Sequence, residues 1–200
     1  MTVEHWQRIY QQKSDSELGW FEPDFEQSLK FIDMTGLKAG ANVFVPGAGT
    51  SGLVDLLHRK GFNLSLNDLS ESALSQIRKR MPEADLDCRV GSIAQPLSPA
   101  LTADLWFDRA VLHFLQEASD IRGYFNNVRA SVKPGGYVLL AEFAKGGATR
   151  CAGLDVTQYD VESMQAGLGQ AFRLISCDDH VFLNPFGQTR PYVYALFQRI

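Results

Sequence analysis

Short apolar runs alternate along the chain with segments in which apolar residues recur every three or four positions. Five of these runs predict buried strands, and two longer runs near the C-terminus predict an antiparallel pair. Strands are expected over residues 42–46, 62–67, 86–90, 103–108, 137–143, 172–183 and 192–199. Because helical segments separate most of the strands, the pattern predicts an α/β fold with a mostly parallel sheet and helices on both faces.

The helical segments are marked by spacing and by end signals. Trp6 and Tyr10 are four positions apart, so they share a face of a short helix over residues 3–12. Asp24 is a candidate cap for a second helix with one apolar side. Further helices are expected over residues 53–60, 71–81, 118–132 and 161–168. The sequence Lys-Pro-Gly-Gly at 133–136 predicts a stop and a turn after the fifth of these six helices, and residues 145–153 predict a loop.

Length and charge narrow the classes of protein. The 200 residues predict one domain over 1–200, in which residues 1–36 form an N-terminal helical cover. The formal net charge of −4 disfavours a nucleic-acid partner, which requires a basic face. We find no signal-peptide pattern and no apolar stretch long enough to span a membrane, so a cytoplasmic monomer or homodimer is expected. The three cysteines lack the spacing of a metal or redox site.

The candidate chemistry begins at a glycine-rich turn after the first strand. Gly47, Ala48 and Gly49 allow a ligand to approach the backbone, and the next helix begins with unpaired N–H groups. Asp68 ends the second strand 21 positions after Gly47, where a carboxylate can accept hydrogen bonds from ribose hydroxyls. This pattern alone leaves three alternatives open: a tight turn without a ligand, a nicotinamide cofactor, or another nucleoside ligand.

Four segments favour one of these alternatives. Residues 43–50 resemble the first motif of class I methyltransferases that depend on S-adenosylmethionine (SAM), and residues 66–70 resemble their second motif. Residues 91–93 resemble the turn that holds the adenine, and residues 132–136 are similar to the signature before the fifth strand. The resemblance implies a Rossmann-like fold with a seven-stranded, mostly parallel sheet and a terminal antiparallel hairpin. It also implies SAM as cofactor, held by Gly47, Ala48, Gly49, Asn67, Asp68, Leu69, Ser92 and Ile93.

A narrower resemblance concerns the thiopurine methyltransferase-like branch. Trp6, Tyr10 and Trp20 are similar to its aromatic N-terminal segment, which covers the cofactor. Asp108 and Arg109 are similar to its acid–arginine pair after the fourth strand, which implies a catalytic role for both and a contact of Arg109 with SAM or the substrate. The alternatives are ordinary packing of an N-terminal helix and an ion pair at a strand end.

Two positions depart from the superfamily pattern. Val45 stands where the first motif usually has an acid, and Ser92 stands where the adenine turn usually has one. His113 is close to Arg109 but is expected to be a packed histidine rather than a base.

The main hypothesis is methyl transfer to a small molecule, such as a thiol or another soft nucleophile that needs no general base. The alternatives are a protein lysine methyltransferase with an acidic groove and a non-catalytic SAM-binding module. No metal site is expected.

Overall fold

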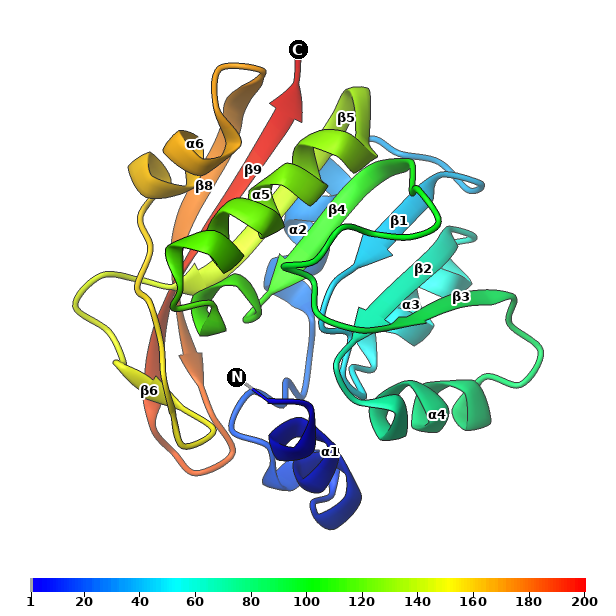
Figure 1. The fold of residues 1–200 in the computed structure, drawn as a ribbon, viewed down its shortest axis with the longest axis vertical. Helices are drawn as coiled ribbons and strands as arrows, with labels where there is room; N and C mark the ends of the chain where they lie inside the picture. The colour runs from blue at the N-terminus through cyan, green and yellow to red at the C-terminus, as the bar shows by residue number, and fades with distance from the viewer. Residues whose placement is uncertain (1) are drawn as a thin grey trace.

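The computed structural model describes residues 2–200 and contains a seven-stranded sheet in the order β3-β2-β1-β4-β5-β9-β8 (Figure 1). The first five strands in sequence are parallel, and β9 is antiparallel to both β5 and β8. This topology confirms the predicted Rossmann-like sheet with its terminal antiparallel pair. The strands are β1 Asn42–Val45, β2 Asn63–Asp68, β3 Leu86–Val90, β4 Ala103–Arg109, β5 Val132–Phe143, β8 Phe172–Leu183 and β9 Thr189–Arg199.

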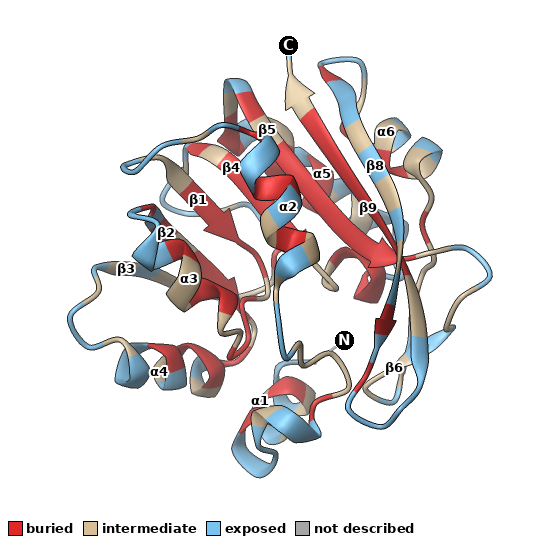
Figure 2. Cartoon of the chain, turned by 180° about the vertical axis from the view of Figure 1, so that it is seen from behind, coloured by how far each residue is buried: buried red, intermediate tan, exposed pale blue. Residues whose placement is uncertain are grey.

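Helices cover both faces of the sheet. The first face carries α2 (Glu26–Met34), α3 (Leu53–Arg59) and α4 (Glu71–Arg80), and the second carries α5 (Ala118–Ser131) and α6 (Val161–Leu168) (Figures 1 and 2). Because successive side chains of a strand point to opposite faces, each central strand contributes to two cores. Val43 and Val45 of β1 lie in the first core, whereas Phe44 lies in the second. Figure 2 shows that burial is concentrated in the central strands.

Local capping explains several helix starts. The Ser70 hydroxyl accepts the N–H of Ala73 at 3.3 Å and so caps the start of α4. The predicted cap of α2 is wrong by one residue. Asp24 Oδ1 accepts the N–H of Glu26 at 3.2 Å, two residues along, and Phe25 occupies the N-cap position. The short side chain of Asp24 therefore forms a local turn before the helix instead of capping it.

The turn predicted at residues 133–136 lies inside β5. Ala103 pairs with Val132 and Leu105 pairs with Tyr137, so four residues of β5 bulge opposite one residue of β4. Gly135 has a φ of +79°, which allows the bulge to fold back into register. The helix signal is still correct, since α5 ends at Ser131. Strand β9 begins three residues earlier than predicted. The loop predicted at residues 145–153 contains a short strand, β6 (Arg150–Cys151), which pairs with β7 (Leu154–Asp155).

Helix α1 (Val3–Gln12) crosses the carboxyl ends of the parallel strands, as a cover over one end of the sheet (Figure 1). The Gln7 side chain connects it to α4, because Gln7 Oε1 accepts the Ser70 hydroxyl at 2.9 Å. Gln76 of α4 donates to the carbonyl of Tyr10 at 2.8 Å. Among residues 2–200 no helix combines the length and apolarity required to cross a membrane, and no cluster of side chains there is suited to a metal ion.

Candidate functional site

Two adjoining cavities lie between α1 and the carboxyl ends of β1, β2 and β4, where the strand order reverses. Open α/β sheets bind ligands at this point. The first cavity is bordered by residues that follow β2 and β3, and the second by the turn at residues 45–53. Four residues line both cavities: Tyr10, Trp20, Gly47 and Arg109. The cavities are therefore two compartments of one site.

The glycine turn after β1 is shaped by close contacts. Gly47 and Gly49 have φ values of +51° and +55°, a conformation that side chains with a Cβ rarely adopt. A Cβ at Gly47 would collide with the side chain of Val111, and one at Gly49 would lie 2.5 Å from the Tyr10 hydroxyl. Glycine is thus required at both positions, because the turn meets β4's exit on one side and the cover on the other.

Asp68 projects into the first cavity at the end of β2. Its Oδ2 accepts the N–H of Gly49 at 2.8 Å, and its Oδ1 accepts the N–H of Ser70 at 2.8 Å. Burial raises the pKa of Asp68 to about 6, although the N–H donors act in the opposite direction. The carboxylate is therefore ionised at neutral pH and held in one orientation. Each oxygen retains a free lone pair for a further donor.

Arg109 lies between the two compartments, with its side chain 8% exposed. Its Nε is 2.9 Å from Glu22 Oε1, and its Nη1 donates to the carbonyl of Trp20 at 3.1 Å. The rings of Phe182 and Tyr192 lie 5.0 and 4.9 Å from its Cζ, within the range of cation–π contacts. Among residues 2–200, no atom accepts a hydrogen bond from its buried Nη2. This leaves one donor of the guanidinium available to a ligand.

The carboxyl groups of Glu22 and Asp15 line the second compartment together with Val45. Burial raises the pKa of Glu22 to about 7, while the positive charge of Arg109 lowers it. Asp15 accepts the hydroxyl of Thr50 in the turn after β1. Two acids from the segment between α1 and α2 thus line the same compartment as Val45.

Asp108 lies outside both compartments. It faces the side of β4 opposite to its neighbours Phe107 and Arg109, which line the second compartment. Its oxygens accept the N–H groups of Val111 and Leu112 at 3.1 and 3.2 Å, and it is fully buried. Burial and the nearby carboxyl of Glu142 raise its pKa. Asp108 therefore holds the turn that carries Val111 and has no path to a ligand in either compartment.

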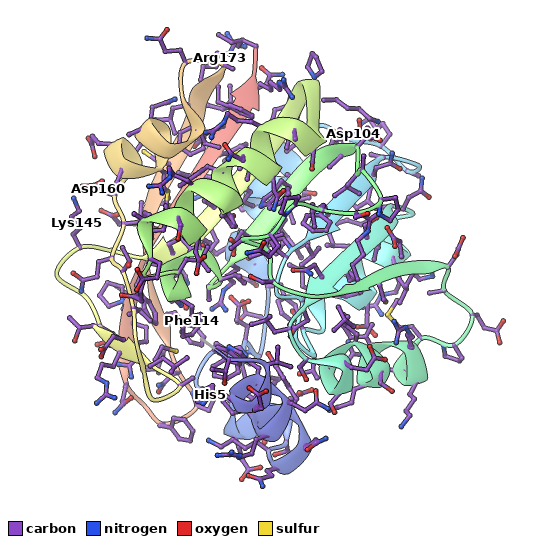
Figure 3. The ribbon with its side chains drawn as sticks, viewed as in Figure 1. His5, Asp104, Phe114, Lys145, Asp160 and Arg173 are labelled. Atoms are coloured by element: carbon purple, nitrogen blue, oxygen red, sulfur yellow. The ribbon has the colours of Figure 1, made fainter. Side chains whose placement is uncertain are left out.

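His113 also lies behind the site. It is fully buried, with Nδ1 2.8 Å from Glu142 Oε2 and its ring stacked on Phe143 at 4.5 Å. Burial lowers its pKa to about 3, so it is neutral. Its neighbour Phe114 does line the first compartment and lies between the sheet and α1 (Figure 3). The 112–114 turn thus presents an aromatic ring, and not the imidazole, to the site.

In the turn after β3, one predicted residue lines the site and the other forms a hydrogen bond within the turn. Ile93 lines the first compartment, whereas the Ser92 hydroxyl accepts the N–H of Ala94 at 3.2 Å and lies outside both linings. Asn67 lines the compartment and donates to the carbonyls of Arg89 and Gly91 at 3.0 and 2.9 Å. Leu69 completes the apolar lining on this side. Of the two residues of this turn predicted to bind SAM, Ile93 therefore lines the first compartment and Ser92 does not.

Aromatic rings of the cover close the first compartment. Trp6 packs edge-to-face on Phe114 at 4.9 Å and on Trp20 at 5.6 Å. Tyr10 packs on Trp20 at 6.3 Å. These three N-terminal aromatics, predicted as a cover, are brought together over the carboxyl ends of the strands. Trp6 and Tyr10 are themselves buried in this packing.

A third cavity, which we call the outer groove, lies beside the covered site. It runs between α1, the turn joining β6 and β7, and the loop joining β8 and β9. It shares Trp20 and Cys151 with the first compartment. Its charged lining is mainly basic and consists of Arg8, Lys13, Arg150, Arg190 and one acid, Glu17.

Sequence reasoning missed several residues that line the site: Asp15, Glu22, Val111, Phe114 and Cys151. Glu22 carried a usable signal, because it is two positions after Trp20 and an extended segment would place both on one side. The position of Val111 depends on Ala110, whose φ of +68° turns the chain towards Gly47. A left-handed alanine leaves no sequence signal of this kind.

Comparisons with known proteins agree with this geometry. Residues 45–140 match a family described as a methyltransferase domain. No protein of curated function matches the sequence. Among solved structures, the chain is similar to the N-methyltransferase NodS from Bradyrhizobium japonicum WM9 in complex with S-adenosyl-L-homocysteine (SAH). The TM-score is 0.77 at 15% identity, over 98% of this chain and 98% of that one.

Two further structures show the same arrangement. A SAM-dependent methyltransferase from Anabaena variabilis ATCC 29413 has a TM-score of 0.77 at 14% identity, over 99% of this chain and 93% of that one. A TehB-like SAM-dependent methyltransferase from Corynebacterium glutamicum ATCC 13032 Kitasato has a TM-score of 0.63 at 14% identity, with 86% of each chain covered. At these identities the similarity establishes the fold.

Proposed function

We propose that this chain, whose residues 45–140 match a methyltransferase-domain family, is a class I SAM-dependent methyltransferase that transfers a methyl group from SAM to a small-molecule acceptor. The observation that carries the proposal is the buried site in which Asp68, Glu22 and Arg109 converge beneath an aromatic cover. The narrower assignment to the thiopurine methyltransferase-like branch is supported by the hydrogen bond from Arg109 to the Trp20 carbonyl, which joins the aromatic N-terminal segment to the residue after Asp108.

The residues present fit the two ends of SAM. In the first compartment, the free lone pairs of Asp68 suit ribose hydroxyls, and Ile93 and Leu69 suit the flat adenine. In the second compartment, the unpartnered Nη2 of Arg109 suits the carboxylate of the methionine part, and Glu22 suits its ammonium group. Glu22 thereby replaces the acid that the first motif lacks at position 45.

When bound, SAM supplies a methyl group that its sulfonium has already activated. The chain's own contribution is to align an acceptor with that methyl group and to exclude water. Trp6, Trp20 and Phe114 exclude water by closing the first compartment. No residue lining either compartment within 2–200 is a histidine. Because this proposal assigns the lining acids Asp68 and Glu22 to SAM, a soft acceptor that reacts without a general base suits this site.

Asp108 acts in this proposal as a positioning residue. Its carboxyl holds the N–H groups of Val111 and Leu112, and Val111 contacts the glycine turn at Gly47. Arg109 alone of the Asp108–Arg109 pair reaches the compartments. The pair thus divides into one residue that contacts ligands and one that supports the turn.

The outer groove favours a small molecule over a lysine-containing peptide. A groove that binds the ammonium side chain of lysine needs acidic neighbours, whereas this one carries four basic residues and one acid. The presence of Glu22 and Asp15 beside Val45 also argues against a non-catalytic SAM-binding module, because either acid can take the role of the first-motif acid.

Calorimetry with SAM and SAH tests the proposal directly. We expect the folded protein to bind both, and to transfer methyl groups from radiolabelled SAM to members of a panel of small thiols, amines and alcohols. Failure of the folded protein to bind either nucleoside would refute the proposal. Binding without transfer to any member of the panel would instead support the SAM-binding module.

A further inference from the structure

We infer that the outer groove selects an acceptor that carries an anionic group, such as a carboxylate or phosphate, on an apolar body. The inference rests on the proposed methyl transfer, since the groove shares a wall with the covered site. The argument depends on three observations: the charge of the groove, its apolar surface and its continuity with the first compartment.

The groove concentrates positive charge in a chain whose formal net charge is −4. Within residues 2–200, Arg8 on α1 and Lys13 directly after it form no salt bridge, and both are exposed. On the opposite wall, Arg190 donates only to neutral groups, namely Gln188 Oε1 at 2.6 Å and the carbonyl of Thr189. Three cations therefore face the groove without a carboxylate partner.

Two further charged residues of the groove, Arg150 and Glu17, each have a partner close by, and Glu17 stays ionised. Arg150 pairs with Asp155 at 3.2 Å, so it contributes little to a ligand. Glu17 is held by Ser14, whose hydroxyl and N–H both donate to its Oε2 at 2.7 and 2.9 Å, and these bonds lower the pKa of Glu17. His5 also lines the groove at the start of α1 (Figure 3). The available charge is thus positive on both walls.

Apolar side chains lie between these cations. Ile9 and Leu18 line the side formed by the N-terminal cover, and Phe186 lines the side formed by the loop between β8 and β9. Phe186 is 60% exposed, which is unusual for a phenylalanine and leaves its ring available for contact. A ligand with an apolar body could pack on these side chains while its anionic group meets Arg8, Lys13 or Arg190.

The groove adjoins the covered site. Trp20 and Cys151 line both the groove and the first compartment, so a ligand in the groove lies one residue layer from the proposed methyl donor. Small acceptors that carry an anion at one end and a nucleophile at the other would be oriented with the nucleophile inward. The cations of the groove thereby determine which acceptors reach the methyl group and in which orientation.

The test compares three probes of similar size: phenyl phosphate, benzyl alcohol and benzylamine. We first load the protein with SAH and then measure the binding of each probe by calorimetry. We expect phenyl phosphate to bind about tenfold more tightly than benzyl alcohol, because two exposed ion pairs contribute about this much. We expect benzylamine to bind most weakly, because its charge repels the cations of the groove. The preference should diminish at high ionic strength.

Charge reversal identifies the groove as the source of the preference. Arg8→Glu and Arg190→Glu should each reduce phenyl phosphate affinity several-fold and leave SAH affinity unchanged. Arg173→Glu is the matched control, because Arg173 is exposed at the opposite end of the molecule (Figure 3). Equal binding of the three probes, or equal effects of all three substitutions, would overturn the inference. If the protein does not bind SAH, it is the proposed function that fails.

Discussion

Removal of the Arg109 guanidinium tests how the centre of the site is held together. Arg109→Met retains most of the side-chain volume but leaves the carboxyl of Glu22 buried without its ion-pair partner at 2.9 Å. Breaking a buried pair in this way destabilises a protein by about 3–5 kcal/mol when the remaining group stays charged. Glu22 can avoid part of that loss by taking up a proton.

The pH dependence follows from the pKa of Glu22. Burial already raises this pKa from 4.5 to about 7, a difference that corresponds to about 3 kcal/mol. Between these two values the folded state binds more protons than the unfolded state, so stability falls as pH rises. Without Arg109 the pKa rises further. The loss of unfolding free energy in Arg109→Met should therefore be small at about pH 6 and approach its full size at about pH 9.

The double variant Arg109→Met/Glu22→Gln removes the carboxyl together with its partner. We expect it to be more stable than Arg109→Met alone at about pH 9, because the residue at position 22 no longer titrates and no longer makes the unfolding free energy depend on pH. Urea denaturation followed by far-ultraviolet circular dichroism measures these differences. A double variant as unstable as the single variant at both pH values would refute the reasoning, because Glu22 would then not be the source of the loss.

Three other substitutions test separate parts of the site. Asp68→Ala should weaken SAH binding by about 1–3 kcal/mol in calorimetry, because it removes a buried acceptor; unchanged affinity would contradict the proposed ribose contact. Gly47→Ala should lower both SAH affinity and stability, and Val111→Ala in the same chain should restore part of each by relieving the collision. Tyr124→Phe removes the hydroxyl that donates to Asp108 at 2.5 Å and should lower the unfolding free energy by about 1–3 kcal/mol, with SAH affinity retained. Urea denaturation measures the unfolding free energy of this variant, and an unchanged value would contradict the expectation.

The order of the elements could be predicted because each carries its own periodicity. β3 and α6 lie at the predicted residues, and β1 and β2 differ by one residue at their ends. The bulge at residues 133–136 could not be predicted, because lysine, proline and two glycines indicate a turn whether or not the strand continues beyond it. β6 and β7 have two residues each, too few to show an alternating pattern.

The site was predictable where it depends on motifs and less so where it depends on packing between distant segments. Asp68 and the glycine turn follow one another within a single strand–helix–strand unit, so their spacing sufficed. The opposite directions of Asp108 and Arg109 follow from strand alternation and could have been stated from the sequence. The meeting of Glu22 with Arg109 joins segments 87 positions apart, and only the folded cover brings them together.

Three residues that line the site lie on the N-terminal cover, and this location couples closure of the cover to ligand binding. Tyr10, Trp20 and Glu22 belong to the segment that closes over the sheet, so closure of that segment and occupancy of the site share the same contacts. Such coupling is reciprocal: if closure of the cover strengthens ligand binding by a given free energy, binding of the ligand stabilises the closed cover by the same free energy. A tighter cover would thus bind its nucleoside more strongly and release the spent product more slowly. Strength of binding and speed of turnover are set against each other by one short N-terminal segment.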